Sequence, residues 1–462
     1  MRKLATLFLA AGLVLSTMQG ISHATDFKVS GEWDFNWEGN NTSFTKHDGS
    51  DRFKARQRLR TQIDMVASES LKGVLFLEIG SLDWGMNDGA AIGTDGINVK
   101  TRYMYVDWTI PQTDIQVRMG LQPFSLPNFV TGDAILGSDD ADGAGITVSY
   151  QFNDTVAATL FWLRAEHDNF TLDSTGTNMD FVGLTLPMSG DGWQLTPWGM
   201  YGDLGKNSLR DDNNEPINEH LAAGLLPINA AVANIAKDSN NPAWWLGIGG
   251  EITPFDPLRL ALDFAYGRAD WGTAADGSMD LTREGWLVSA LAEYRLPMLT
   301  PGLILWYGSG DDSNALNGSE RMPTVAPGWG ATSFGWNGGF GIADDAAISN
   351  TPTGTWGVVA RLADISLMED LTHTLAVGFY TGTNDTQMAR VVADPRTDRG
   401  LYLTTDDHAL EVNFDSQYKV YENLTLAVEL GYIHLDLDSS VWSGVSNLEK
   451  NAYKAGLNLN YA

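Results

Sequence analysis

The sequence predicts an all-β fold, a transmembrane antiparallel β-barrel of about 18 strands with short periplasmic turns and long extracellular loops. Two observations carry this prediction. Apolar and polar residues alternate in segment after segment, and the connections between these segments are alternately short and long. A third observation narrows the alternatives. No run of about 18 uncharged apolar residues follows residue 24, which excludes a helical membrane protein.

The N-terminal 24 residues have the pattern of an export signal. Two basic residues precede an apolar stretch, 4–15, that is too short to span a bilayer, and Ser22-His23-Ala24 fits a small-x-small cleavage site. We therefore expect residues 1–24 to be a cleaved signal peptide. Residues 25–462 are then expected to form a single barrel domain.

Composition excludes several classes of protein before any motif is considered. The chain has 29 Lys and Arg against 58 Asp and Glu, a formal net charge of −29, which would repel nucleic acid. It has no cysteine, which removes disulfide frameworks, thiolate catalysis and zinc–thiolate sites. Its 49 Gly and 16 Trp are typical neither of a disordered chain nor of a soluble enzyme. No nucleic-acid partner is expected.

The first segment after the signal shows the alternation without a break. One of its faces is apolar: Phe27, Val29, Gly31, Trp33, Phe35 and Trp37. The other face is polar: Lys28, Ser30, Glu32, Asp34, Asn36 and Glu38. Such a strand separates two environments. One strand of this kind also occurs in a soluble sandwich, so the prediction depends on its repetition to residue 461.

About 18 segments show this period, and an even number is expected of a single-chain barrel. The expected strands are 26–38, 52–68, 71–84, 98–110, 113–122, 143–152, 155–166, 178–188, 192–203, 243–253, 257–270, 281–296, 301–310, 354–366, 371–382, 405–419, 423–436 and 449–461. A barrel of 16 strands is the alternative, because some of these segments have poorly defined ends.

The connections alternate in length in a way that a bilayer explains, because transmembrane β-barrels have short turns on one side of the membrane and long loops on the other. Short connections fall at 68–70, 111–113, 153–154, 189–191, 254–257, 297–301, 366–370 and 420–423. Long polar ones fall at 39–51, 85–97, 123–142, 167–178, 204–242, 311–353, 383–404 and 437–447, with the shorter 271–280 among them. We expect the long set to face outward.

Motifs of catalysis are absent from the sequence. It contains no His-Glu-x-x-His, no Gly-x-Ser-x-Gly and no complete dinucleotide fingerprint. Asp139, Asp140 and Asp142 resemble half of a calcium loop that lacks the closing Glu, so solvated loop acids are the preferred interpretation. No cofactor is expected, and Ca²⁺ or Mg²⁺ is considered only as a loosely bound ion at the acidic outer loops.

Two segments carry a resemblance to a known family. Val117-Arg118-Met119-Gly120-Leu121-Gln122-Pro123-Phe124 resembles the fifth strand of a Gram-negative porin where it enters an inward-folded third loop. The run Tyr453, Ala455, Leu457, Leu459 and Tyr461 resembles the assembly-signal strand, although Ala462 follows it. With the signal peptide and the loop rhythm, the mature chain is similar to Gram-negative outer-membrane porins, including those of sulfate-reducing bacteria. The resemblance implies passive diffusion, a homotrimer, and a constriction between acidic loop residues and a basic wall.

Strand alternation adds candidate residues for that constriction. It places Arg56, Arg58, Arg60 and Arg118 on the lumen face, since arginine on the lipid face costs about 2–4 kcal/mol at the bilayer midplane. The third long loop carries Asp133, Asp139, Asp140 and Asp142 and no Lys or Arg. Folded inward, these acids would face the arginines and set a transverse field. The alternative is an exposed third loop. Arg259 is expected to lie away from this zone.

Three functions remain open. The first is a general outer-membrane porin for small hydrophilic solutes and ions, which is not an enzyme. The second is a substrate-specific, anion-selective channel, and the third is a barrel enzyme in which a Ser or Asp at a strand rim works with a His. Expected partners are outer-membrane lipid and lipopolysaccharide. Ion preference stays open as well, because external acids favour cations whereas inward arginines favour anions.

Overall fold

The structure is a computed structural model that describes residues 25–41, 52–86, 89–94, 98–137, 141–167, 178–205, 207–210, 216, 218–236, 240–343, 346–397, 400–443 and 450–462. The expected signal peptide lies outside the described residues, and so do Asp139 and Asp140. Within the described residues, no helix is long and apolar enough to cross a membrane.

The first half of the chain supplies ten strand segments in chain order: β1 (Asp26–Asn41), β2 (Arg52–Ser68), β3 (Leu71–Asp83), β4 (Val99–Thr109), β5 (Ile115–Pro123), β6 (Asp142–Gln151), β7 (Ala157–Glu166), β8 (Met179–Thr185), β9 (Met188–Gly190) and β10 (Trp193–Leu204). Segments β8 and β9 both pair with β10, so they are two halves of one strand. Pro187 lies between them and cannot donate a backbone hydrogen bond, which explains the break.

The second half supplies β11 (Asn241–Phe255), β12 (Leu258–Thr273), β13 (Asp280–Tyr294), β14 (Thr300–Gly308), β15 (Thr355–Met368), β16 (Leu371–Gly382), β19 (His408–Tyr421), β20 (Leu424–Asp436) and β21 (Asn451–Tyr461). The loops hold α2 (Glu219–Leu225), η1 (Val232–Asn234), η2 (Thr386–Met388), α3 (Ala389–Val392), β17 (Arg396–Thr397) and β18 (Gly400–Leu401).

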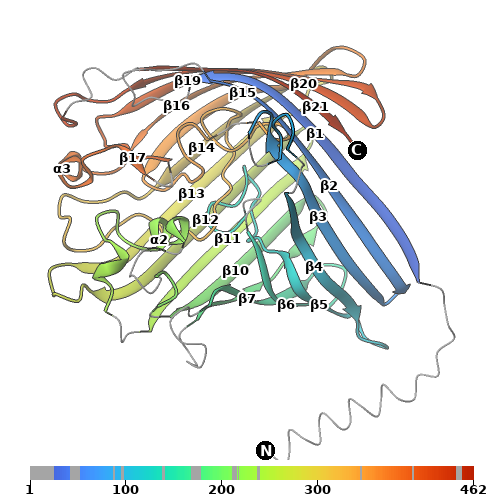
Figure 1. The fold of residues 1–462 in the computed structure, drawn as a ribbon, viewed down its shortest axis with the longest axis horizontal. Coiled ribbons are helices and arrows are strands. Elements are labelled where there is room, and N and C mark those ends of the chain that lie inside the picture. The colour runs from blue at the N-terminus through green and yellow to red at the C-terminus, as the bar shows by residue number, and fades with distance from the viewer. Residues whose placement is uncertain are drawn as a thin grey trace, which may run out of the picture.

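The strands close into a single barrel. Each pairs antiparallel with the next along the chain, and β1 pairs with both β2 and β21, with Trp33 opposite Tyr461. With β8 and β9 counted as one strand, the described residues form a closed barrel of 18 strands, which confirms the predicted fold class and excludes 16 strands. Helices α2 and α3 lie with the long loops at one end of the barrel, on the left in Figure 1.

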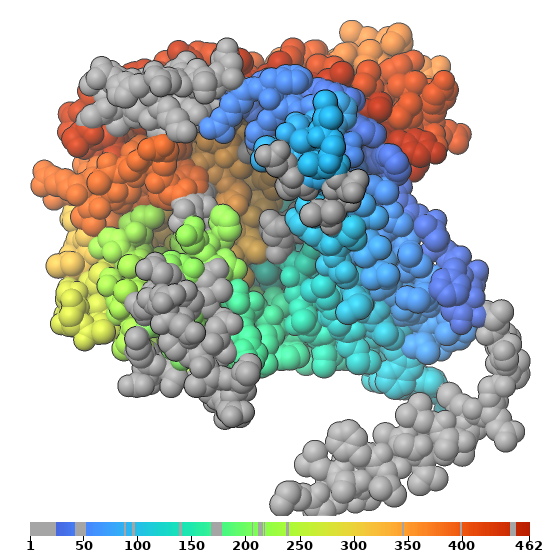
Figure 2. Space-filling view, viewed as in Figure 1, coloured from blue at the N-terminus to red at the C-terminus, as the bar shows by residue number. Residues whose placement is uncertain are grey.

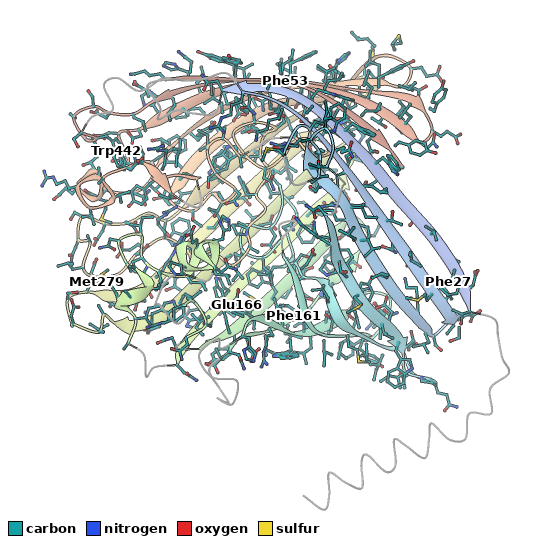
Figure 3. The ribbon with its side chains drawn as sticks, viewed as in Figure 1. Phe27, Phe53, Phe161, Glu166, Met279 and Trp442 are labelled. Carbon is teal, nitrogen blue, oxygen red and sulfur yellow. The ribbon has the colours of Figure 1, made fainter. Side chains whose placement is uncertain are left out.

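The two faces of the wall are reversed relative to those of a soluble protein. On β20, Leu430 is 45% exposed and its polar neighbour Glu429 only 2%. The same alternation continues around the barrel, so the outer face is apolar and the inner face carries the polar side chains. Phe27 and Phe53 lie at opposite ends of the first hairpin, where aromatic rings mark the limits of the apolar band (Figure 3). This wall requires an apolar solvent outside and a polar one within.

Short turns join the strands at the end opposite to the long loops, as predicted. The seventh long loop, L7 (309–354), corrects the expectation that the long loops face outward. Trp329 and Trp336 of this loop are at most 1% exposed and pack against Trp306 of the inner wall at ring-centroid distances of 6.0 and 5.2 Å. L7 therefore folds into the lumen, because burial of its aromatic side chains on an aromatic inner wall is favourable.

Candidate functional site

The third long loop, L3 (124–141), crosses the lumen from β5 to the opposite wall. The backbone N–H groups of Phe129 and Val130 both donate to the Asp263 carboxylate of β12, each at 2.9 Å. Arg259, also on β12, donates to the Phe129 carbonyl at 2.9 Å. Asp263 lies on the inner face, between the exposed Leu262 and Phe264. The tip of L3 is therefore tied to the inside of the barrel.

L3 and L7 form one layer across the lumen. Leu136 and Ala326 form a parallel bridge, and the Gly328 amide donates to the Asp133 carbonyl at 2.8 Å. Gly132 has a φ of +103°, and a Cβ there would lie 2.4 Å from the Gly328 carbonyl oxygen, so the contact of the two loops requires glycine. The chain thus narrows its own lumen with two loops rather than one.

The far end of L7 is fastened to the last strands and to the first hairpin. Glu411 of β19 accepts hydrogen bonds from the Gly335 amide, the Thr332 hydroxyl and the Tyr380 hydroxyl, all at 2.9 Å. The Phe340 amide donates to Glu429 of β20 at 2.6 Å. These contacts hold L7 against β16, β19 and β20. They leave the opening on the side of β1 to β6.

Asp133 does not face that opening, contrary to the sequence expectation. Its side chain turns back into L3. The carboxylate accepts hydrogen bonds from the backbone amides of Leu126, Ile135 and Leu136 at 2.6, 2.8 and 3.1 Å. The residue is 5% exposed, and this burial raises the pKa of Asp133 to about 6. Its role in the structure is to shape the loop. A count of loop acids could not distinguish it from a pore-lining carboxylate.

The predicted arginines do lie on the inner wall, but each is paired within that wall. Arg58 Nη2 lies 2.8 Å from Asp34 Oδ2, and Arg56 Nε lies 2.9 Å from Asp83 Oδ1. Arg118 Nε lies 2.7 Å from Asp107 Oδ1. Neighbouring strands supply all of these acids, so the expected separation of an acidic loop from a basic wall is wrong for the described residues.

The central group of ion pairs on this wall includes two residues, Glu78 and Arg102, that the sequence did not predict. Glu78 of β3 lies 3.1 Å from both Arg60 and Arg102, and Arg102 Nε lies 2.5 Å from Asp142 Oδ2. Asp142 is the first residue of β6 rather than a loop acid. We call Arg60, Glu78, Arg102 and Asp142 the charged belt. Arg102 was missed because the β3–β4 register shifts between Phe76 and Leu77, which interrupts the alternation at this point.

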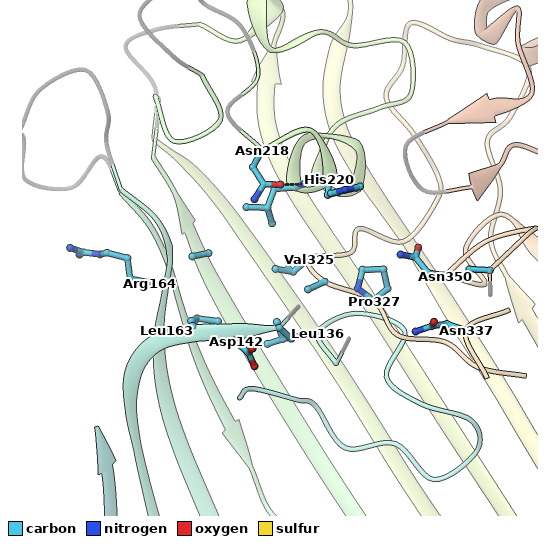
Figure 4. A pocket seen from close by; sticks show the side chains of 16 residues that line it. Leu136, Asp142, Leu163, Arg164, Asn218, His220, Val325, Pro327, Asn337 and Asn350 are labelled. Atoms are coloured by element: carbon cyan, nitrogen blue, oxygen red, sulfur yellow. Dashed lines mark hydrogen bonds between the residues drawn. The ribbon is translucent and has the colours of Figure 1, made fainter. Parts of the chain in front are cut away.

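Two cavities lie inside the barrel, and Asp142 of the charged belt lines the outer one. The outer one, about 470 Å³, lies between β6, β7, L3, L7 and α2, and its lining includes Asp142, Gly143, Leu221 and Pro327 (Figure 4). The inner one, about 640 Å³, is lined by β1 to β6 and includes Lys72, Arg118 and Gln122. Gln122 and Gly143 are register partners across β5 and β6, so the two cavities adjoin. Figure 2 shows the hollow between the first strands (blue to cyan) and the fifth loop (light green).

An aromatic strip runs along the inner wall beside the charged belt. The rings of Phe76 and Tyr103 stack with centroids 4.8 Å apart, and Tyr105 follows at 6.4 Å. The guanidinium of Arg118 lies 4.2 Å from the centroid of the Tyr105 ring. The strip therefore has Arg102 at one end and Arg118 at the other. Ring faces flanked by arginine can hold a solute that has a flat apolar part and an acidic group.

One further expectation, the position of Arg259, changes with the structure. Arg259 was expected to lie away from the constriction, yet it contacts the tip of L3 through the Phe129 carbonyl. Arg164 lies on the outer face with the exposed Trp162 and is paired with Asp180 at 2.9 Å. In Figure 4 its side chain points away from the outer cavity. Among the described residues, no group of three or more His, Cys, Asp or Glu is placed to hold a metal ion.

Comparison with known proteins agrees with this architecture. No protein-family model matches the chain, and no curated protein matches it. Among solved structures it is similar to Pseudomonas aeruginosa OccK2 (OpdF) in complex with glucuronate, with a TM-score of 0.54 and 14% identity over 94% of this chain and 97% of that one. It is also similar to OpdK with vanillate from the same organism, with a TM-score of 0.53 and 10% identity over 94% and 98%. At this level of identity the likeness concerns the fold.

Proposed function

We propose that this chain is an outer-membrane channel through which small hydrophilic solutes and ions diffuse passively. One observation carries the proposal: a closed barrel with an apolar outer face contains two adjoining cavities whose linings include charged side chains, among them Asp142, Lys72 and Arg118. Charged side chains on the wall replace part of the hydration shell of a passing solute, while the width left by L3 and L7 limits its size. The apolar outer face of the closed barrel supports a location in the outer membrane. The lumen inside it would let small solutes through.

A narrower function is favoured by the charged belt and the aromatic strip together. We propose that the channel prefers small organic anions that contain a ring. Arginine binds carboxylates in a fixed, bidentate geometry, and the rings of Phe76, Tyr103 and Tyr105 offer flat contact surfaces. The solved structures of OccK2 with glucuronate and of OpdK with vanillate contain ligands of that description. The preference is modest in this proposal, because each arginine already has a carboxylate partner.

Single-channel recording tests both levels of the proposal. The purified barrel in a planar lipid bilayer should give discrete conductance steps, whereas a barrel closed by its loops would give none. Glucuronate and benzoate should reduce the current more than acetate at equal concentration. Equal block by all three anions would leave the general channel intact and remove the ring preference. The two proposals therefore fail separately.

The enzyme alternative requires a His beside a Ser or Asp, and His373 and Ser416 form such a contact. His373 Nδ1 lies 2.8 Å from the Ser416 hydroxyl on the outer face, and its ring stacks on Phe414 at 5.4 Å. This stacking explains the position of the ring as packing at the membrane interface. Replacing Ser416 with Ala should leave conductance unchanged, and phospholipid hydrolysis that disappears in this variant would revive the enzyme interpretation.

The expected homotrimer belongs to the proposal as well. The barrel closes within one chain through the pairing of β1 with β21, so a single chain is enough to enclose a lumen. Cross-linking in native membranes separates the two states. A ladder that ends at three subunits supports the trimer, and a single band at one subunit rejects it without affecting the channel.

A further inference from the structure

The outer face of the last three strands carries a polar cluster above the aromatic girdle. The cluster consists of His408 on β19, His434 and Asp436 on β20, Asn451 at the start of β21, and Lys450 directly before it. Within the strands its residues follow the lipid-facing positions, and Lys450 reaches the same side through its pair with Asp436. Leu430 and Tyr432 of β20 are 45% and 44% exposed, and His434 and Asp436 continue the same alternation. These groups therefore point to the membrane side rather than into the lumen.

Contacts among these side chains form two adjacent sets, which lie side by side because His434 and Asp436 share one face of β20. Lys450 Nζ is paired with Asp436, and His408 Nε2 lies 3.8 Å from Asp436 Oδ2. The Asn451 amide oxygen lies 2.9 Å from His434 Nδ1 and accepts the Tyr432 hydroxyl at 2.7 Å. The side chains of His408 and Lys450 remain 50% and 49% exposed. The cluster is thus held in place and is still open to a ligand.

The depth of the cluster corresponds to that of lipid headgroups. Tyr432 faces Tyr453 in the register, and His434 faces Asn451 two residues further along. Two residues of a strand rise about 6.6 Å, comparable with the roughly 5–8 Å that separate the hydrocarbon edge from the outer headgroup surface. The long loops leave from this end of the strands, so the leaflet is the outer one. A lipid beside these strands would have its chains on Leu430 and its headgroup at the cluster.

Charge distinguishes this sector from two others at the same height. Arg164 is paired with Asp180, whose register partner is Asp203. Arg268 is paired with both Asp270 and Glu284. Each of those two groups has two carboxylates for one cation, which suits divalent cations more than anions. The β19–β21 cluster has one carboxylate for one lysine and two histidines, so it offers donors to an anion.

We infer that this cluster is a binding site for the phosphorylated glycolipid headgroup of the outer leaflet, the lipid A part of lipopolysaccharide. Lys450 and the two imidazoles would bind a sugar phosphate, and Asp436 would hold Lys450 and His408 in position. Tyr432 and Tyr453 would contact the sugar and the acyl carbonyl groups at the interface. The inference concerns the outer wall and does not depend on which solute crosses the lumen.

Binding of lipid A to the purified full-length protein in detergent tests this inference, with EDTA present throughout to remove cation bridges. We expect the triple variant His408→Gln, His434→Gln, Lys450→Gln to bind lipid A more weakly, by on the order of fivefold or more, since each basic group near a membrane surface contributes about 1 kcal/mol. Arg164→Gln is the matched control because it removes a cation at the same height, and its affinity should not change. Native mass spectrometry gives the bound fraction.

Three further measurements make the result decisive. Dephosphorylated lipid A should lose affinity for the wild-type protein to the same extent as the triple variant loses affinity for lipid A. Inorganic phosphate at equal concentration should not compete, and full competition would assign the site to a free anion and overturn the lipid inference. Unaltered heat-modifiability and conductance of the variant would show that the barrel is intact. Wild-type affinity in an intact triple variant would overturn the inference.

Discussion

At the scale of single residues, the same ion pair has different consequences on the two faces of the wall. Arg102 and Arg164 each form a pair with an aspartate of a nearby strand, at 2.5 and 2.9 Å. Arg102 lies in the charged belt with 12% of its side chain exposed, whereas Arg164 faces outward with 37% exposed. Whether a permeating ion interacts with the arginine depends on which face of the wall the arginine occupies. It does not depend on the presence of the Arg–Asp ion pair.

Replacement of Arg102 with Gln should therefore shift ion preference toward cations. The variant removes a positive charge and leaves Glu78 and Asp142 with less compensation. An ion that passes at about 4 Å in water-like surroundings would feel a change of about 1 kcal/mol, with opposite sign for an anion and a cation, which is on the order of 30-fold in the ratio of anion to cation permeability. Reversal potentials in a salt gradient measure this ratio. Arg164→Gln should leave it unchanged, and equal shifts in both variants would mean that the charged belt does not control selectivity.

A second prediction concerns Asp133 inside L3. Its pKa is raised by burial from the ordinary 3.8 to about 6, so the folded state binds this proton more tightly than the unfolded state. The contribution of Asp133 to stability is therefore greatest below pH 3.8 and is lost as pH rises through about 6. Each pKa unit corresponds to about 1.4 kcal/mol. The difference in unfolding free energy between wild type and Asp133→Asn should vary with pH from 4 to 7, and a constant difference would contradict the prediction.

At the scale of elements, the strands could be predicted from the sequence and the two inner loops only in part. Alternation locates a strand because each face contacts a different solvent, and the observed β2 (Arg52–Ser68) and β16 (Leu371–Gly382) have the predicted bounds. Alternation says nothing about partners, which depend on register. That is why Glu78 and Arg102 were missed. L7 was taken for an outward loop because alternation locates strands but does not show that the inner faces of β14 and β16, with Trp306 and Tyr380, offer an aromatic docking surface to the loop.

The anchor of L3 gives a prediction for that element. Asp263 holds the loop tip through two backbone amides, and hydrogen bonds to a charged group contribute about 1.5–3 kcal/mol each. Asp263→Ala should release the tip, increase the unitary conductance and add rapid fluctuations in current. Asp64→Ala is the control, because this aspartate faces the lumen and contacts Gln62 and Lys72 but none of the L3 residues that the structure describes. Unchanged conductance in Asp263→Ala would show that the tip does not limit the pore.

At the scale of the whole molecule, an acidic exterior and a balanced charged belt act on the same ions. The chain has twice as many acidic as basic residues, with 58 Asp and Glu against 29 Lys and Arg. On the outer face near the long loops, the Arg164 and Arg268 groups each have two carboxylates for one cation. The charged belt inside the lumen instead has two arginines for two acids, and Arg58 and Arg118 lie on the same wall. The two distributions differ in the range over which they act.

Ionic strength should therefore change the selectivity of the channel. The Debye length is about 30 Å at 0.01 M salt and about 3 Å at 1 M. In dilute salt the acidic exterior reaches the mouth of the lumen and concentrates cations, whereas in concentrated salt only charges beside the ion path remain effective. We expect the anion-to-cation permeability ratio to rise with salt concentration at a fixed tenfold gradient. In Arg102→Gln the permeability ratio should be lower than in the wild type at every salt concentration, while its rise with salt, which the acidic exterior causes, should be similar. A wild-type ratio independent of salt would show that the exterior charge does not act on the pore.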